Sequence, residues 1–101
     1  MTVNHRVSDD GRQVTIAVTD RFDFSVHREF REAYRASGGP GTTYQVDLGQ
    51  TEYMDSSALG MLLLLKEHAG GDRASVVIRH TPANIRKILE IANFHKLFAI
   101  E

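Results

Sequence analysis

The sequence predicts a single α/β domain in which helices pack on a mixed sheet of four to five strands. A chain of 101 residues can form one hydrophobic core and is too short for two, so we expect one domain over residues 1–101. Some segments carry apolar residues at every second position and others at helical spacing, and the two kinds alternate after residue 40. Such alternation is typical of a parallel or mixed sheet flanked by helices.

The first segments predict a β-hairpin. Residues 3–7 have weak strand character, and residues 9–12 form a turn of polar residues and glycine. A stronger strand is predicted over residues 14–19, where large apolar side chains alternate with small or polar ones. One face of this hairpin should therefore be buried.

A helix is predicted after a loop at residues 20–24. Ser25 is a suitable N-cap, and apolar residues follow at four-residue spacing with charged residues between them. These inward positions are Val26, Phe30 and Tyr34. The helix should end near residues 37–41, where glycine and proline are concentrated.

A third strand at residues 43–48 is predicted to lead directly into a polar loop that carries Ser56 and Ser57. The helix expected over residues 56–68 has leucine or methionine around most of its circumference, so we expect it to be buried on nearly all sides. The glycines at residues 70 and 71 should end it.

The last third of the chain predicts a strand, a helix and a short final strand. Residues 74–78 are rich in β-branched side chains, as in a buried strand. Thr81 and Pro82 are a favourable N-cap and first-turn pair for the helix. Its inner face is predicted to consist of Ile85, Ile88, Leu89 and Ala92. The final strand is expected within residues 97–100.

Composition excludes several classes of function. A formal net charge of −1 lacks the basic excess of a nucleic-acid binder, so we expect no direct nucleic-acid contact. The longest apolar run, residues 61–65, is far short of the roughly 20 residues of a membrane-spanning helix, so no membrane insertion is expected. The first residues do not resemble a secretory signal, and the absence of cysteine fits a reducing compartment. We therefore expect a cytoplasmic protein.

Ser56 and Ser57 are the most informative residues, because they stand where the polar loop becomes an apolar helix. Backbone N–H groups at a helix start lack partners and carry a partial positive charge, which suits a hydroxyl oxygen or a phosphate. Ser56 is thus a candidate cap and a candidate phosphorylation site. Asp55 is an equally good N-cap, and in that alternative both serines lie in the first turn without a chemical role.

Asp23 is a second candidate, because it precedes the first helix as Asp55 precedes the second. Loops at the carboxyl ends of neighbouring strands gather at one sheet edge, so Asp23 and Asp55 are expected to lie side by side around Ser56. The alternative is that Asp23 is an ordinary turn residue.

Catalytic chemistry finds no support in the sequence. Ser56 lacks the flanking glycines of a nucleophile elbow, and the chain has no glycine-rich phosphate-binding loop. The five histidines are scattered, with no pair at metal-ligand spacing. We therefore expect no catalytic residue, no metal and no cofactor, and a small hydrolase with Ser56 as nucleophile is the least favoured function.

The run from Asp55 to Gly60, Asp-Ser-Ser-Ala-Leu-Gly, resembles the signature loop of STAS domains. It is similar in particular to that of bacterial anti-sigma factor antagonists of the SpoIIAA and RsbV type. The order of the remaining features agrees over nearly the whole chain: the hairpin, the turn at residues 21–23, the strand from Thr43, the strand around Val76 and the helix after Pro82. The resemblance implies a STAS-type fold.

The same resemblance implies that Ser56 is phosphorylated by a partner kinase, which in this family is often the anti-sigma factor itself. A PP2C-type phosphatase would remove the phosphate. Asp23 and Asp55 would surround the phosphorylation site, and Ser57 would be an unmodified neighbour. The partner-binding loop would continue through Ala58, Leu59 and Gly60. Ala58 stands where the family commonly has glycine, and alanine favours helix.

The function implied is partner switching. The unphosphorylated protein would bind an anti-sigma factor and so release a sigma factor, and phosphate on Ser56 would disfavour that contact. The alternative is a STAS module that serves as a fixed subunit or scaffold of a larger complex, such as a lipid-transport system, without phosphorylation.

Overall fold

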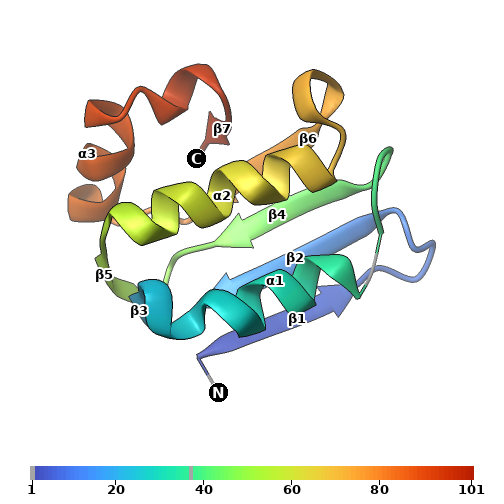
Figure 1. Ribbon diagram of the computed structural model, residues 1–101, viewed down its shortest axis with the longest axis horizontal. Helices are drawn as coiled ribbons and strands as arrows, with labels where there is room; N and C mark the ends of the chain where they lie inside the picture. The colour runs from blue at the N-terminus through green and yellow to red at the C-terminus, as the bar shows by residue number, and fades with distance from the viewer. Residues whose placement is uncertain (1, 37) are drawn as a thin grey trace.

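The computed structural model describes residues 2–36 and 38–101 and has a five-stranded sheet at its centre (Figure 1). From edge to edge the strands are β1 (Val3–Val7), β2 (Gln13–Val18), β4 (Thr43–Asp47), β6 (Ser75–Arg79) and β7 (Ala99–Ile100). The β1–β2 pair is antiparallel and the other neighbours are parallel. The predicted hairpin and mixed sheet are thus confirmed.

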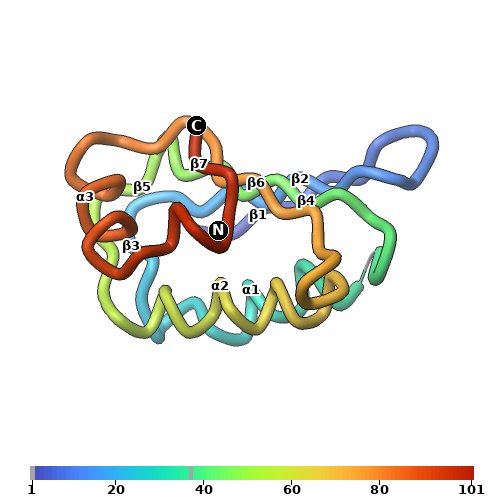
Figure 2. The backbone as a smooth tube through the Cα atoms, turned by 90° about the horizontal axis from the view of Figure 1, so that it is seen from above, coloured from blue at the N-terminus to red at the C-terminus, as the bar shows by residue number. Residues whose placement is uncertain are grey.

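Helices α1 (His27–Arg35) and α2 (Ser56–His68) lie side by side on one face of the sheet (Figure 2). The inward positions of β2 are buried against them, whereas Thr15 and Ala17 on the opposite face are only half-buried. The predicted inward residues of the first helix are buried as well: Val26, Phe30 and Tyr34. Helix α1 ends at Arg35, and Ser37, part of the end predicted for it, lies outside the described residues.

A second, two-stranded parallel sheet was not predicted. Strand β3 (Asp20–Phe22) occupies most of the segment expected to be a loop, and β5 (Thr51–Met54) stands between β4 and the serine loop, which β4 was expected to reach directly. These strands have only three and four residues, too few for an alternating pattern to identify them. The Thr51 hydroxyl, which donates to the Val18 carbonyl at 2.6 Å, ties this small sheet to the main one.

Helix α2 has the predicted length but not the predicted burial. Met61, Leu62 and Leu65 are buried, whereas Leu63 and Leu64 are 40% and 52% exposed. The expectation that this helix is covered on nearly all sides is therefore wrong, because the side that carries Leu63 and Leu64 is left partly uncovered. Two leucines remain in solvent.

Two predicted caps are also wrong. Ser25 does not cap α1, since it lies inside a 3₁₀ turn, η1 (Phe24–Val26), whose N-cap is Asp23. Pro82, and not Thr81, is the N-cap of α3 (Ala83–Ile91), because the Thr81 hydroxyl donates to the Glu101 carbonyl. Two further 3₁₀ turns are η2 (Gly71–Arg73) and η3 (Phe94–Lys96).

The inner face of α3 is the predicted one, with Ile85 and Leu89 fully buried and Ile88 and Ala92 partly buried. This helix packs against β5 and so closes the end of the molecule at which α2 begins. Over the described residues, every helix is too short or too polar to span a lipid bilayer.

Candidate functional site

The small sheet brings two aspartates to the same end of the molecule. Phe22 of β3 is paired with Met54 of β5, and both side chains are buried. The residue after each strand is an aspartate, Asp23 after β3 and Asp55 after β5. Because the two strands are parallel and are paired up to this point, the two aspartates occupy equivalent positions on neighbouring segments of the chain.

Asp55 is the N-cap of α2. Its carboxylate accepts a hydrogen bond from the Ser57 N–H at 3.0 Å, and its carbonyl accepts one from the Ala58 N–H at 3.1 Å. Ser56 is therefore not the cap, and both serines lie in the first helical turn, which is the alternative arrangement that the sequence allowed. Ser56 is exposed, Ser57 is half-buried and Ala58 is fully buried, so the exposed hydroxyl stands on a firmly packed helix start.

Asp23 has more partners than Asp55. It accepts hydrogen bonds from the Ser25 N–H at 3.0 Å and from the Ser25 hydroxyl, and it pairs with Arg21 Nε at 2.9 Å. The Ser25 hydroxyl first, and then the Arg21 guanidinium, hold the pKa of the Asp23 carboxyl below its usual value. Asp23 thus remains ionised at neutral pH as the cap of the η1 turn.

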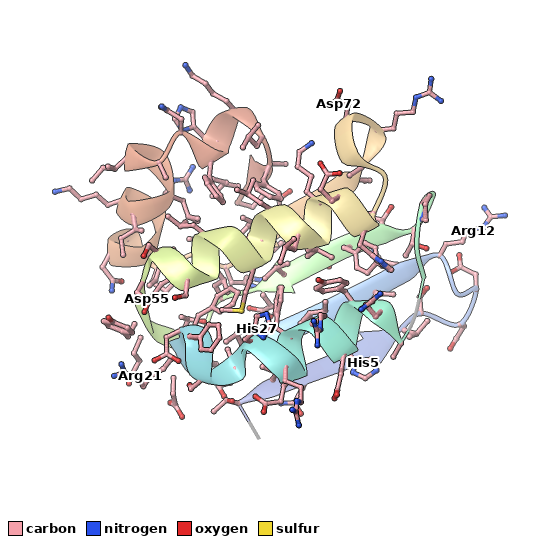
Figure 3. The ribbon with its side chains drawn as sticks, in the orientation of Figure 1. His5, Arg12, Arg21, His27, Asp55 and Asp72 are labelled. Atoms are coloured by element: carbon pink, nitrogen blue, oxygen red, sulfur yellow. The ribbon has the colours of Figure 1, made fainter. Side chains whose placement is uncertain are left out.

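Arg21 and Tyr53 complete the outer face of the small sheet. They are register partners, and the Arg21 guanidinium carbon lies 4.3 Å from the centre of the Tyr53 ring. Figure 3 shows Arg21 and Asp55 at the same end of the molecule. Side chains two residues apart on a strand share a face, so Arg21, Asp23 and Tyr53 project to the side opposite the buried Phe22.

An apolar groove runs from this end along the surface of α2. Its volume is about 540 Å³. It is lined by Phe24, His27, Ser57, Gly60, Met61, Leu63, Leu64 and Glu67. Phe24 is 68% exposed and stacks on His27 with 5.0 Å between the ring centres. Single exposed apolar residues are common, but a continuous exposed apolar groove indicates a binding surface.

The structure thus gathers the residues that the sequence singled out, namely Asp23, Asp55, Ser56, Ser57, Ala58, Leu59 and Gly60. Leu59 is half-buried against the core, and Gly60 lines the groove. Sequence reasoning missed Arg21, Phe24 and Tyr53. A signal that could have found them is a pattern that occurs twice in the sequence. Arg21 and Tyr53 are each followed by a large apolar residue and then by an aspartate.

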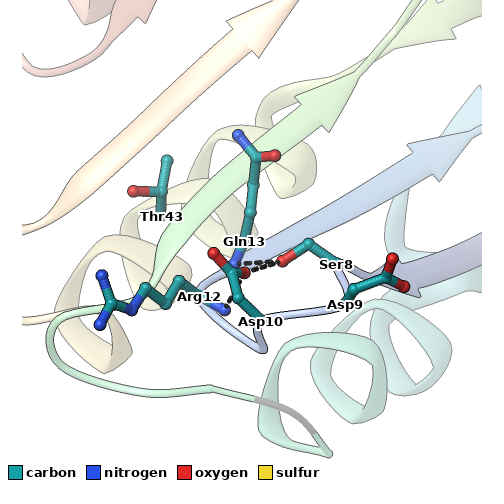
Figure 4. A pocket seen from close by; sticks show the side chains of 6 residues that line it. All are labelled: Ser8, Asp9, Asp10, Arg12, Gln13 and Thr43. Carbon is teal, nitrogen blue, oxygen red and sulfur yellow. Dashed lines mark hydrogen bonds between the residues drawn. The ribbon is translucent and has the colours of Figure 1, made fainter.

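A second hollow differs from the groove because polar and charged residues line it. It has a volume of about 500 Å³ and lies at the β1–β2 turn (Figure 4), at the opposite end of the molecule from Asp55, as the position of Arg12 in Figure 3 shows. There Asp10 accepts hydrogen bonds from the Ser8 hydroxyl at 2.6 Å and the Arg12 N–H at 3.0 Å, which lower the pKa of its carboxyl. These contacts complete an ordinary turn. Within residues 2–36 and 38–101, no group of three potential ligands is placed to hold a metal ion.

Comparison with known proteins connects this site to a family. A family model described as "Mlab, STAS domain" matches residues 5–99. A STAS-domain containing protein of Pseudomonas aeruginosa strain UCBPP-PA14 is 46% identical over 100 residues, with 99% of each chain covered.

Two solved structures share the fold. The unphosphorylated anti-sigma factor antagonist SpoIIAA superposes with a TM-score of 0.72 at 12% identity, over 98% of this chain and 86% of that chain. An anti-sigma factor antagonist from Mycobacterium paratuberculosis gives 0.74 at 15% identity, over 97% of this chain and 84% of that chain. Sequence identities this low concern the fold alone.

Proposed function

The chain belongs to the STAS-domain family, and from that premise we propose that it is a phosphorylation-controlled partner-switching protein, an anti-sigma factor antagonist acting in the cytoplasm. Its unphosphorylated form binds an anti-sigma factor that is also a serine kinase, and this binding releases a sigma factor. The kinase phosphorylates Ser56, and a PP2C-type phosphatase reverses the modification. The protein itself carries no catalytic residue and needs no metal or cofactor.

The observation that carries this proposal is that Asp55, and not Ser56, is the N-cap of α2. Asp55 caps α2, so the exposed Ser56 hydroxyl is not needed to hold the helix start together. A phosphate on Ser56 meets the partly positive end of a helix of 13 residues, which tolerates it without refolding. The modification then changes the surface of the protein and leaves its core intact.

The apolar groove supplies the partner-binding surface in this proposal. It begins at Ser57, next to the modified residue, and continues over Leu63 and Leu64. A phosphoserine adds about 1.5 to 2 negative charges, which must be desolvated if a partner covers the groove. Asp55 adds a further negative charge beside it. A loss of about 3 kcal/mol in binding free energy lowers affinity more than a hundredfold, which is enough for a switch.

The rival function is a fixed subunit or scaffold of a larger complex, such as a lipid-transport system. A constitutive partner would use the same groove, and it would be indifferent to the residue at position 56. The two functions therefore differ in what happens at Ser56 and agree on the surface used.

Phosphate mapping separates them. We would isolate the protein from its native host under two growth conditions and locate phosphate by mass spectrometry, then compare partner capture by Ser56→Ala and Ser56→Asp, with Ser57→Ala as the matched control. The switch predicts phosphate on Ser56 that varies with condition, capture by Ser56→Ala and loss of capture by Ser56→Asp. Absence of phosphate under every condition, including phosphatase depletion, together with equal capture by all variants, would establish the fixed subunit instead.

A further inference from the structure

Arg21 is bonded in a way that leaves most of its hydrogen-bonding capacity open. Its Nε donates to Asp23 Oδ2 at 2.9 Å, and its guanidinium lies over the Tyr53 ring. Among the described residues, neither terminal amino group of Arg21 has a hydrogen-bond partner, and the side chain is 61% exposed. The two terminal amino groups, which can form a two-pronged contact with an oxyanion, are therefore available for bonding. The guanidinium that carries them is positioned by Asp23 and Tyr53.

The position of this guanidinium relative to Ser56 is set by the strand register. Arg21 is paired with Tyr53, yet its side chain reaches forward along β3 to Asp23, the position level with Asp55. Ser56 is the next residue beyond Asp55, and it is exposed. A phosphate extends farther from the backbone than the serine hydroxyl does. The free amino groups of Arg21 and a phosphate on Ser56 thus share one end of the small sheet.

The charges at this end also require a cation. Asp23 and Asp55 are neighbours, and Asp55 turns its carboxylate toward the Ser57 N–H. A doubly charged phosphate placed next to them is disfavoured by repulsion unless a positive group offsets it. Arg21 is a cation at this end of the small sheet, and it already pairs with Asp23.

We propose that Arg21 binds the phosphate on Ser56 through its two terminal amino groups while its Nε stays on Asp23. This inference rests on the proposed phosphorylation of Ser56 and specifies its regulation. The phosphate at the start of α2 is then held in one position, with the guanidinium shared between the Asp23 carboxylate and the phosphate. Tyr53 supports the contact because its ring, 4.3 Å from the guanidinium carbon, restricts where the guanidinium can move, and Tyr53 does not touch the phosphate.

The test uses protein with phosphoserine incorporated at position 56 during translation and follows the phosphorus resonance by NMR as pH is varied. A nearby guanidinium favours the doubly charged phosphate, whose second pKa is otherwise about 6. We expect Arg21→Gln to raise the proton affinity of the phosphate by about threefold or more, which is half a pKa unit. Arg21→Lys keeps the charge without the two-pronged donor set and should give an intermediate value.

Arg12→Gln is the matched control, because it removes the same charge at the far end of the molecule. Its phosphate should titrate as in the unsubstituted protein. Equal midpoints for Arg21→Gln and Arg12→Gln would overturn the proposal. Since the phosphate is introduced without a kinase, this result is independent of the proposed function, whose own failure would appear as missing phosphate in cells. A native amide spectrum for each variant shows that the comparison concerns folded protein.

Discussion

The segments β3–Asp23 and β5–Asp55 have the same local structure and differ in the residue that follows the aspartate. Each strand ends in a buried residue and then an aspartate whose carboxylate accepts a hydrogen bond from the N–H two residues later. After Asp23 comes the exposed aromatic ring of Phe24, and after Asp55 comes the exposed hydroxyl of Ser56. The Asp23 carboxylate also binds Arg21 and the Ser25 hydroxyl. Among the described residues, the Asp55 carboxylate has one hydrogen-bond partner, the backbone N–H of Ser57.

The difference indicates a separation of tasks at one surface. The more strongly bonded cap, Asp23, is followed by the apolar side chain of Phe24, which lines the groove, and the less strongly bonded cap, Asp55, is followed by Ser56, the proposed phosphorylation site. In the proposed function, a partner that covers the groove contacts Phe24 and lies next to Ser56, because Ser57 lines the groove. In the proposed switch, binding affinity thus depends on Phe24 in η1, and control of binding depends on Ser56 at the start of α2.

The largest effect is expected from the buried residues beneath the two caps. Phe22 is fully buried and Met54 is 4% exposed. Truncation should cost about 3–5 kcal/mol for Phe22→Ala and about 2–5 kcal/mol for Met54→Ala, because each leaves a cavity in a packed core. Denaturant unfolding measures both. A near-neutral result for either would mean that its strand is not anchored as described, and the comparison of the two caps would fail.

The next effect concerns partner binding. We expect Phe24→Ala to weaken binding of the unphosphorylated protein by about thirtyfold, equivalent to about 2 kcal/mol, because exposed aromatic residues in apolar grooves are frequent binding hot spots. Calorimetry with the purified partner measures the change. Leu97→Ala, at a residue that is 46% exposed and does not line the groove, is the control and should bind normally. Equal affinities for the two variants would remove Phe24 from the interface.

A smaller effect separates the caps themselves. Asp55→Ala should reduce the free energy of unfolding by about 0.5–2 kcal/mol, the usual cost of losing an N-cap on a regular helix. Asp23→Ala should cost less, because Asp23 caps a 3₁₀ turn of three residues whereas Asp55 caps a helix of 13 residues. Thermal unfolding of the two variants in parallel decides the order, and the reverse order would mean that the bonds to Arg21 and Ser25 dominate.

The smallest effect is on acid sensitivity. The pKa of Asp23 is lowered in the folded protein, so its ionised form favours folding. That contribution is complete above the usual aspartate pKa of about 3.9 and is lost as pH falls through the lower folded value. Carboxyl titration by NMR should show the Asp23 midpoint rising more in Ser25→Ala than in Arg21→Gln, since the Ser25 hydroxyl is the larger cause. A larger rise in Arg21→Gln would reassign that cause.

Strands β2, β4 and β6 and the three principal helices could be predicted from the sequence, because the apolar pattern of each extends over five or more residues. Strands β3 and β5 could not, because three or four residues are too few for a periodicity to be detected. The exposure of Leu63 and Leu64 was missed for a different reason. Because leucines lie on every side of this helix, the sequence does not show which of them are buried. Their burial depends on how α2 packs on the sheet and against α1.

The part of the candidate site that depends on residue types next to each other in the sequence could be predicted. The part that depends on the pairing of β3 with β5 could not. Asp55 and Ser56 stand next to each other in the sequence, and their place before an apolar helix is visible there. Arg21, Phe24 and Tyr53 become relevant only once β3 lies beside β5. Their contribution depends on strand register, which sequence periodicity does not determine for segments this short.

The firmly packed start of α2 has a consequence for the timing of the proposed switch. Ala58, two residues after the exposed serine, is fully buried, and Asp55 caps the first turn, so we expect the proposed modified form to keep the backbone of the unmodified one. No folding or domain motion then limits the response. Its speed is set by the turnover of the kinase and phosphatase and by the dissociation rate of the partner. In the proposed switch, the fraction of molecules that carry phosphate thus follows the recent balance of kinase and phosphatase activity.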